Sequence, residues 1–505
     1  MKTTHTFAIT LTALIASFAL PACDAQEPSA AAPQTQGKPN VVFMLADNVG
    51  YGDIGGAFQG GVIRGMPTPR IDQLQNESMV FTQHIVEPGC TPSRAGLMTG
   101  RYAHRSGCGS IIVAGTPNTL GADEITMAEL FKSRGYKTAM TGKWHLGSAE
   151  QSWPTNQGFD EYRVGVRETS DSALYRGYME RAGFPEAVIA KAVPQIWEGT
   201  TEDGLKAVRE YTTEYRKQVE GDVTKASIAY IKERAKKDEP FFLYVGFTHT
   251  HYPVLTAPQF EGKSPAGPYG DAVMELDFRT GEILDAIKAA GIEDNTIVIW
   301  ISDDGASPMG GPLAGRGGSN GIYSGELGDG LDGSVRTPGM IKWPGKIKPS
   351  KSNGMVSIHD FFTTLGNIIG ADIPDDRAID GIDQTDFFLG KQENSNRDSV
   401  LAFLGDEMVG VRWKNYRIYP KNWTKTTGVP AMGGAFGART ETNGYPLVFN
   451  IFSDPREEHN IIGDNAWVMG PYLKAIGAYK KSLVDDPNPP AFSLQTGSFS
   501  KPEGP

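Results

Sequence analysis

Polar residues that could take part in chemistry follow four apolar runs of the chain. Asp47 and Asn48 follow PNVVFMLA, Lys143 and His145 close YKTAMTGKWH, His249 and His251 close FFLYVGFTHTH, and Asp303 and Asp304 follow NTIVIWIS. Three carboxylates and an amide are hard oxygen ligands, which suit Ca²⁺ or Mg²⁺ better than zinc. The lysine and histidines are donors for a negatively charged group. These residue types predict a divalent cation held beside a site for an anion.

Cys90 lies in the stretch EPGCTPSRAGLMTGRY, where a loop is expected to become a helix. Thr91 suits the N-cap, Pro92 the first helical position and Gly100 the stop. The amino end of a helix favours anions. Arg94, one turn into the helix, adds a guanidinium whose fork geometry fits tetrahedral oxyanions. We therefore expect Cys90 at the anion-attracting end of a short helix.

The chain has three cysteines, which limits what Cys90 can do. If Cys23 is lipidated or removed, Cys90 and Cys108 remain, and in an oxidising compartment the two could form a disulfide. The helix and loop between them direct their ends apart, and Cα atoms more than about 7 Å apart cannot be bridged. We favour a modified or reactive Cys90, with the disulfide as the alternative.

Helical patterns separate the apolar runs, which indicates β-α-β organisation. The patterns are EITMAELFKSRG at 124–135, DVTKASIAYIKERAKK at 222–237 and AVMELDFRTGEILDAIKAAG at 272–291. This alternation predicts a mostly parallel sheet flanked by helices. Because open α/β sheets bind ligands at the carboxyl ends of their strands, the polar residues should meet in one crevice.

Composition is that of a globular protein with a large core, since 39% of the 505 residues are hydrophobic. We expect an α/β domain over 38–395, a smaller domain over 396–480 with a short antiparallel sheet and a helix, and an extended tail over 481–505. The net charge of −11 argues against a general nucleic-acid-binding protein. An anionic ligand must therefore be held by a local cluster of cations.

The amino terminus is predicted to direct export. Residues 1–22 have the short basic start and apolar stretch of a signal peptide, too short to span a bilayer comfortably. The boundary LPAC resembles a bacterial lipobox, with Cys23 as the lipidated residue, although Pro21 fits poorly. Residues 23–37 have the composition of a flexible tether. We expect a periplasmic or cell-envelope lipoprotein, with ordinary secretion as the alternative.

The segment CTPSR followed by AGLMTGRY resembles the Cys-x-Pro-x-Arg formylglycine signature of the type I sulfatases. The resemblance continues in NVVFMLADNVGYGDIG, PTPRIDQL, TGKWHLG, THTHYP, IWISDDG, RTPGMIKWPG and LVFNIFSDPREEHN. It covers about residues 38–463 and is closest in wording to the branch of arylsulfatase A and N-acetylgalactosamine-6-sulfatase. It implies an alkaline-phosphatase-like α/β fold and hydrolysis of small-molecule or saccharide sulfate esters.

The resemblance also implies a role for each site residue. Cys90 would be oxidised by a maturation enzyme to Cα-formylglycine, whose hydrate attacks the sulfur atom and later expels sulfate as the aldehyde reforms. The calcium ligands would be Asp47, Asn48, modified Cys90, Asp303 and Asp304. Arg94 and Lys143 would steady the nucleophile and the sulfate charge. His145 would assist collapse of the intermediate, and His251 would protonate the leaving oxygen.

Two departures from the family pattern stand out. The family shows Asp-Asp at the first pair and Asp-Asn at the second, whereas here Asn48 and Asp304 reverse the order, so the carboxylate total is unchanged. Leu327 occupies the position where related enzymes carry a lysine that touches the sulfate and the leaving group. Arg316, in AGRGG, is a candidate substitute.

Four further histidines and four aromatic residues point less clearly to a function. We interpret His84, His359 and His459 as structural or surface residues, and His249 as pointing to the opposite face of its strand from His251. Segments 150–222 and 255–268 are expected as insertions around the crevice. Their aromatic residues either line a substrate pocket or serve packing: Trp153, Tyr162, Tyr175 and Trp197.

The sequence favours a sulfate-ester hydrolase over two alternatives. One is a phosphodiester or phosphonate monoester hydrolase that uses the same formylglycine site, because the charge and tetrahedral geometry of the substrates are similar. The other is a lipid-anchored protein that binds sulfate esters without turnover, which the leucine at 327 makes conceivable. No nucleic-acid partner is expected.

Overall fold

The computed structural model describes residues 37–113, 115–307, 317–423, 439–442, 444–493 and 496–500. The predicted signal peptide, the lipidation site at Cys23 and nearly all of the tether lie outside these residues. So does Arg316. The described residues belong to one compact unit, residues 36–505.

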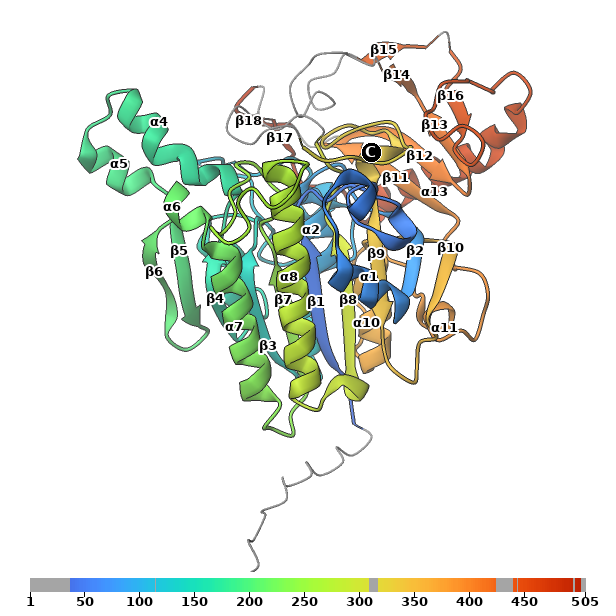
Figure 1. Cartoon of the computed structure of the whole chain (residues 1–505). Coiled ribbons are helices and arrows are strands. Elements are labelled where there is room, and N and C mark those ends of the chain that lie inside the picture. The colour runs from blue at the N-terminus through green and yellow to red at the C-terminus, as the bar shows by residue number, and fades with distance from the viewer. Residues whose placement is uncertain are drawn as a thin grey trace, which may run out of the picture. The chain divides into compact units, whose positions relative to one another are not determined.

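A ten-stranded sheet forms the centre of the protein, in the order β10-β2-β9-β8-β1-β7-β3-β4-β5-β6 (Figure 1). Its strands are β1 Asn40–Ala46, β2 Met79–Ile85, β3 Lys137–Lys143, β4 Glu161–Val166, β5 Gln195–Thr200, β6 Gly204–Glu210, β7 Phe241–Gly246, β8 Thr296–Ser302, β9 Arg336–Lys342 and β10 Ser350–Ser357. The middle strands β8, β1, β7, β3 and β4 are parallel to one another, and β2 and β10 form a further parallel pair. The four apolar runs of the sequence are the neighbouring strands β8, β1, β7 and β3, as the α/β prediction requires.

Two layers of helices bury the two faces of the sheet. Successive side chains of β1 alternate between them: Val41, Phe43 and Leu45 belong to one hydrophobic core. Val42 and Met44 belong to the other. The first core is closed by α2 Cys90–Thr99, α3 Met127–Ser133 and α10 Asp360–Ile369, and the second by α1 Pro69–Asn76, α7 Val219–Arg234 and α8 Pro268–Ala289. In Figure 1, α7 and α8 lie in front of the sheet.

The helices α3, α7 and α8 confirm the three predicted helical segments. Helix α2 was predicted with Thr91 as its N-cap, and this is wrong, because the helix already includes Cys90 and follows Gly89. The Thr91 hydroxyl instead accepts a hydrogen bond from the main-chain N–H of Ile112, at 3.1 Å. The predicted stop is confirmed, since Gly100 has a left-handed backbone with φ of 69°.

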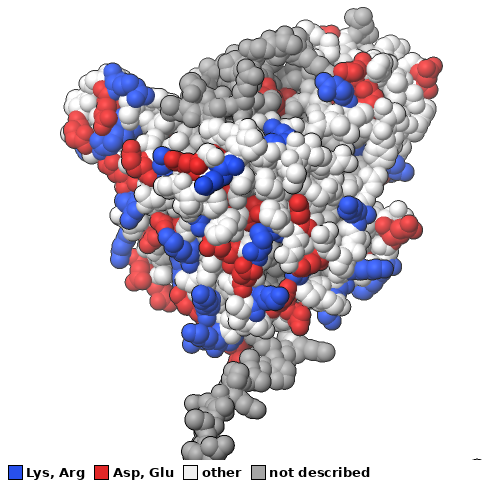
Figure 2. Space-filling model, viewed as in Figure 1, with Lys and Arg blue, Asp and Glu red and all other residues white. Residues whose placement is uncertain are grey.

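Segment 150–222 is more than an insertion around the crevice, which corrects that expectation. It contributes β4, β5 and β6, which lengthen the central sheet. Two short helices, α4 Tyr175–Arg181 and α5 Glu186–Ala192, come between β4 and β5 in the chain, and α6 Thr213–Arg216 follows β6. Two further short helices come later in the chain, α9 Asp332–Val335 before β9 and α11 Thr385–Phe388 after α10. In Figure 2, acidic and basic side chains are interspersed over the face that is drawn. Among the described helices, none has the length and apolarity needed to cross a membrane.

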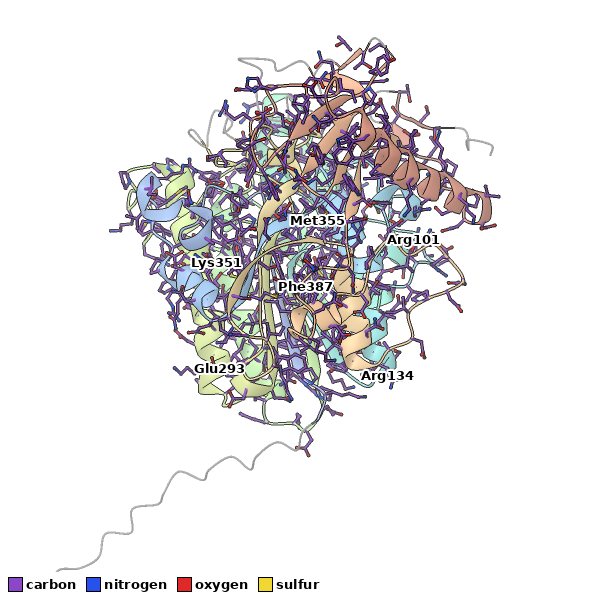
Figure 3. The ribbon with its side chains drawn as sticks, turned by 90° about the vertical axis from the view of Figure 1, so that its right-hand side faces the viewer. Arg101, Arg134, Glu293, Lys351, Met355 and Phe387 are labelled. Atoms are coloured by element: carbon purple, nitrogen blue, oxygen red, sulfur yellow. The ribbon has the colours of Figure 1, made fainter. Side chains whose placement is uncertain are left out.

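A smaller antiparallel sheet follows, in the order β11-β12-β13-β16. Its strands are β11 Ser399–Leu404, β12 Glu407–Trp413, β13 Tyr416–Tyr419 and β16 Leu447–Asn450, beside the pair β14 Lys421–Trp423 and β15 Arg439–Glu441. Figure 3 views the molecule from the side of β10, which carries Lys351 and Met355. The predicted boundary between residues 395 and 396 stays a prediction, because both sheets belong to the same compact unit.

The carboxyl-terminal segment differs from the extended tail that was predicted. Helix α13, Met469–Asp485, confirms the predicted helix but runs five residues into the segment predicted as tail. A short hairpin then pairs β17 Phe492–Ser493 with β18 Ser498–Phe499, and the Phe492 and Phe499 rings lie 5.3 Å apart. The tail is therefore partly folded.

Candidate active site

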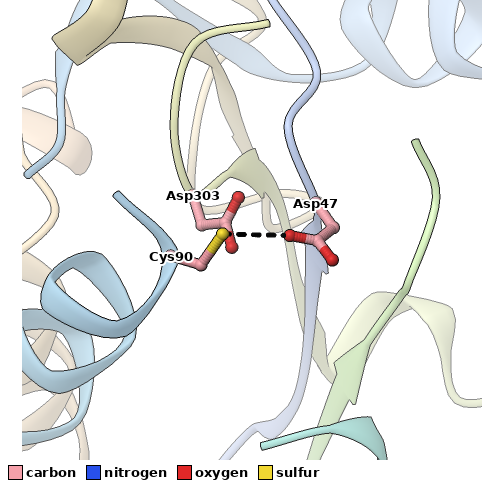
Figure 4. A group of neighbouring side chains, drawn as sticks. All are labelled: Asp47, Cys90 and Asp303. Carbon is pink, nitrogen blue, oxygen red and sulfur yellow. Dashed lines mark hydrogen bonds between the residues drawn. The ribbon is translucent and has the colours of Figure 1, made fainter. Parts of the chain in front are cut away.

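The ends of β1 and β8 and the start of α2 bring together a cluster of potential ligands. The Sγ atom of Cys90 lies 3.5 Å from Oδ1 of Asp47. One ligand atom from each of Asp47, Cys90 and Asp303 lies within 4.8 Å of the other two (Figure 4). All three residues are buried. The structure thus brings Cys90 to the predicted carboxylates.

Asn48 connects the two acidic strand ends. Its main-chain N–H donates to Oδ1 of Asp303 at 3.1 Å. In the amide orientation that satisfies its hydrogen bonds, its side-chain nitrogen donates to Oδ1 of Asp304 at 2.7 Å. The reversed pair is therefore in direct contact, since the amide of the first pair faces the extra carboxylate of the second.

Arg94 and Lys143 neutralise part of the acidic cluster. The Nε atom of Arg94 donates to Oδ2 of Asp303 at 2.9 Å, and Nη1 donates to the carbonyl oxygen of Lys143 at 2.9 Å. The Nζ atom of Lys143 lies 2.8 Å from both carboxylate oxygens of Asp47. Burial acts to raise the pKa of Asp47, but Lys143, His251 and Arg94 together hold that pKa well below its ordinary value.

Negative charge remains in excess at the second acidic pair. Burial raises the pKa of Asp303 to about 6, despite Arg94. Burial, followed by the neighbouring charges of Asp303 and Asp47, raises the pKa of Asp304 well above its ordinary value. Within the described part of the chain, Asp304 takes part in no ion pair. A buried carboxylate without a balancing cation, beside a second carboxylate and an amide, fits a hard divalent ion.

His145 lies directly after β3 with its ring locked on one side. Its Nε2 atom is 2.7 Å from the carbonyl oxygen of Ile112, so Nε2–H donates there. The Nδ1 atom is buried and has no hydrogen-bond partner among the described residues. Burial and the charge of Lys143 hold the pKa of His145 well below its ordinary value. The ring is therefore neutral, and Nδ1 presents a lone pair that can accept a proton.

His251 lies on the loop after β7. Its Nδ1 atom is 2.6 Å from the carbonyl oxygen of Tyr252, so Nδ1–H donates there and Nε2 takes no part in this hydrogen bond. Burial and Lys143 lower the pKa of His251, while Asp47 opposes this shift. In the neutral ring Nε2 carries a lone pair, so His251 can deliver a proton from Nε2 only after it becomes protonated.

A buried ion network under His251 was missed by sequence reasoning. The Nη2 atom of Arg216 donates to the carbonyl oxygens of Thr248 at 3.1 Å and His251 at 3.3 Å, and contacts Nδ1 of His249 at 3.1 Å. An oxygen of Glu220 accepts from the main-chain N–H of Thr248 at 2.7 Å. Arg216 ends α6 and Glu220 begins α7, so neither follows an apolar run. The available signal was a charged residue on the buried face of a helix.

His84, His249, His359 and His459 lie outside the cluster, in structural or surface positions, as predicted. His249 is 3.1 Å from the carboxylate of Glu275 on α8 and so points away from the cluster. His84 and His359 are buried and bonded to the hydroxyl groups of other residues. The side chain of His459 is 78% exposed.

The structure also bears on the two cysteines and the predicted aromatic lining. Cys90 and Cys108 are both free and buried, so the alternative disulfide is not formed. Tyr162 is fully buried, and its hydroxyl donates to the carbonyl oxygen of Gly142, which is a packing role. The rings of Trp153 and Trp197 lie 5.8 Å apart.

At the sequence position of the expected lysine, the described chain has a leucine. Leu327 is buried, with 6% of its surface exposed. The candidate substitute, Arg316, lies outside the described residues. The described cations that bond to the cluster carboxylates are Arg94 and Lys143.

Comparisons with known proteins agree over nearly the whole chain. A family model described as Sulfatase matches residues 39–371. Arylsulfatase A of Homo sapiens is 31% identical over 461 residues, covering 87% of this chain and 86% of that protein. N-acetylgalactosamine-6-sulfatase of Canis lupus familiaris is 32% identical over 466 residues, covering 85% and 82%. The crystal structure of the PsFucS1 sulfatase from Pseudoalteromonas sp. superposes with a TM-score of 0.82 at 30% identity, covering 90% of this chain and 92% of that one.

Proposed function

The chain belongs to the sulfatase family and is a sulfuric ester hydrolase, and from this premise we propose that it works through a formylglycine made from Cys90 and a bound calcium ion. One observation supports this proposal above the others. The Sγ atom of Cys90 lies within 4.8 Å of a carboxylate oxygen of Asp47 and one of Asp303, both buried. Cys90 is also at the amino end of the helix that carries Arg94. Nucleophile, cation ligands and anion donors are thereby adjacent.

The surroundings of Cys90 disfavour a reaction through the thiol itself. Burial and the nearby Asp304 raise the pKa of the Cys90 thiol well above its ordinary value, so the thiol stays protonated. A protonated thiol is a weak nucleophile. The hydrate of a formylglycine supplies a hydroxyl nucleophile at the same place and can later release sulfate by reforming the aldehyde.

We assign the cation ligands to the oxygen-rich cluster. Asp47, Asp303, Asp304 and the oxygen of the modified residue 90 would hold calcium, together with Asn48 once its amide is turned so that the oxygen faces residue 90, as in its 3.4 Å contact with Cys90 Sγ. When bound, calcium would supply positive charge beside the nucleophile and the sulfate oxygens. The same charge would offset the excess of carboxylates at Asp303 and Asp304.

The basic residues divide into anion holders and proton carriers. Arg94 and Lys143 are fixed by their carboxylate partners, so they can stabilise developing negative charge without reorganisation. His145 presents a free Nδ1 lone pair, which suits it to take the proton of the second hydroxyl as sulfate leaves. His251, once protonated, would give the Nε2 proton to the leaving oxygen.

The substrate class that we favour is a saccharide sulfate. The support comes from relatives, one of which is named for its action on N-acetylgalactosamine 6-sulfate. The test begins with protein produced alongside a formylglycine-generating enzyme and assayed on 4-nitrophenyl sulfate, a phenyl phosphonate ester and a set of sugar sulfates. Sulfate-ester hydrolysis that Cys90→Ala abolishes supports the proposal. Faster turnover of the phosphonate ester would favour the phosphonate hydrolase instead.

We also propose that the protein is exported and anchored through a lipidated Cys23. The support is the apolar amino-terminal stretch and the LPAC boundary. Metabolic labelling with a radioactive fatty acid should label the parent and not Cys23→Ser. Label-free protein released into the medium would favour ordinary secretion.

A further inference from the structure

A cavity of about 150 Å³ lies at the carboxyl end of β4. Its polar lining comes from Arg167, Glu168, Ser172, Lys191, Gln195 and Tyr211, and Trp197 forms part of its wall. The volume is below the ~300–1,000 Å³ of pockets that take drug-sized ligands. The cavity therefore has room for a single small ring and not for a chain.

This cavity shares a wall with the candidate active site. The main-chain N–H of His145 donates to the carbonyl oxygen of Arg167 at 3.1 Å. Asp171, a few residues further along, interacts electrostatically with His251. Tyr211, another lining residue of the cavity, interacts electrostatically with Lys143. Residues 167–171 thus border both the cavity and the two histidines assigned to proton transfer.

Among the buried polar atoms of the lining that lack a hydrogen-bond partner within the described chain, two lie on neighbouring residues. The Nε atom of Arg167 and the Oε2 atom of Glu168 have no hydrogen-bond partner in the part of the chain that the structure describes. Arg167 is held in place by stacking, since its guanidinium carbon lies 4.0 Å from the ring centre of Trp197 and 5.5 Å from that of Trp153. A buried donor and a buried acceptor left unpaired cost free energy. A ligand that both donates and accepts would remove this cost.

The geometry points to a subsite for the sugar ring next to the sulfated one, so we propose that the enzyme acts on oligosaccharide sulfates. This inference rests on the proposed function. A pair of sugar hydroxyls offers both a donor for Glu168 and an acceptor for Arg167, side by side.

The experiment compares sugar sulfates of two lengths. Disaccharide fragments of chondroitin sulfate, carrageenan and sulfated fucan are each assayed against the corresponding monosaccharide sulfate, with kcat/KM as the readout. The parent is expected to prefer at least one disaccharide by about tenfold or more. Equal kcat/KM for both members of every pair would overturn the inference.

Two variants then locate the preference. Arg167→Met keeps the long apolar stem on Trp197 but removes Nε, and Glu168→Gln keeps the shape of the side chain but removes its charge. Each should lower the disaccharide-to-monosaccharide ratio at least fivefold. The control is Arg163→Met, on β4 and four residues before Arg167. The Arg163 guanidinium pairs with Glu161 and Glu233. That variant should keep the parental ratio.

The outcomes separate this inference from the proposed function. If the parent hydrolyses 4-nitrophenyl sulfate and the ratio survives in both Arg167→Met and Glu168→Gln, the subsite is wrong and the sulfatase assignment stands. If the parent hydrolyses no sulfate ester at all, the proposed function fails and this inference fails with it. Should one variant fold poorly by thermal melting, the other decides.

Discussion

Lys143 places its Nζ atom 2.8 Å from both carboxylate oxygens of Asp47, with both side chains fully buried. The two residues come from β3 and the end of β1, which are separated in the sheet by β7. The lysine therefore reaches across a strand to bind a residue that is also a proposed calcium ligand. This ion pair links the anion-holding side of the site to its cation-holding side.

Replacing Lys143 tests whether the anion-holding and cation-holding sides of the site depend on each other. Lys143→Met leaves Asp47 buried without its main cation, and breaking one partner of a buried ion pair typically costs about 3–5 kcal/mol. We expect a lower melting temperature in chelator and a partial recovery when Ca²⁺ is added, because the ion can balance the freed carboxylate. Equal melting temperatures for variant and parent in chelator would contradict this role.

The reversed ligand pair offers a test of charge compensation. Asp304→Asn alone removes one carboxylate and should weaken Ca²⁺ binding by about tenfold or more, a change of roughly 1.4 kcal/mol. The double variant Asn48→Asp with Asp304→Asn restores the number of carboxylates and should recover most of that affinity. Isothermal titration calorimetry on chelated protein measures both values. A double variant that binds no better than Asp304→Asn would show that position, not total charge, decides.

Leu327 predicts how rate depends on the leaving group. A positioned donor for developing charge is commonly worth about 3–4 kcal/mol, by analogy with the loss of an oxyanion-hole donor. Without that lysine, cleavage of the ester depends more strongly on protonation of the leaving oxygen by His251. Rates over a series of aryl sulfates should depend steeply on leaving-group pKa, and His251→Ala should slow the poorest leaving groups most.

Arg316 provides the counter-test for that series. If Arg316 fills the gap, the parent shows a shallow dependence and Arg316→Ala makes it steep. A shallow dependence in both proteins would mean that another cation serves at the leaving group, and the reading of Leu327 would be abandoned.

Glu457 should make stability depend on pH. It is buried between Tyr419, whose hydroxyl donates to it at 2.8 Å, and the main-chain N–H of Asp332 at 3.0 Å. Burial raises its pKa to about 8, from an ordinary value of 4.5. The folded state then holds a proton that the unfolded state has lost, so this stabilisation is complete below pH 4.5 and is lost as the pH rises through 8.

The matched variant is Glu457→Gln, which cannot titrate. The free energy of unfolding, measured by chemical denaturation at fixed Ca²⁺, should fall more steeply from pH 5 to 8 for the parent than for the variant. The difference should grow by roughly 1 kcal/mol or more over that range. Parallel curves would show that Glu457 titrates normally.

The sequence predicted the elements of this site whose signals are local. An apolar run that ends in polar residues is typical of a buried parallel strand. Four such runs predicted Asp47, Lys143, His251 and Asp303 at the carboxyl ends of neighbouring strands. The start of α2 was placed two residues late, because Thr91 and Pro92 are good capping residues, yet the Thr91 hydroxyl accepts a hydrogen bond from the distant Ile112.

What the sequence could not predict depends on contacts between distant segments. Arg216 acts on the loop of His251 from a helix more than thirty residues earlier, and nothing near it in the chain shows this. The insertion that carries Arg167 was expected to surround the crevice, but its strands continue the sheet by edge pairing. Edge pairing depends on which strand end is available after the core has formed, which no local pattern records.

The central claim is that residue 90 works as a formylglycine. Peptide mass spectrometry of protein purified with a formylglycine-generating enzyme, set beside protein produced without one, tests it most directly. We predict that the peptide containing residue 90 carries an aldehyde in place of the thiol, and that activity on 4-nitrophenyl sulfate rises in proportion to the converted fraction. Fully active protein in which Cys90 is an unmodified thiol, or is joined to Cys108, would contradict the account.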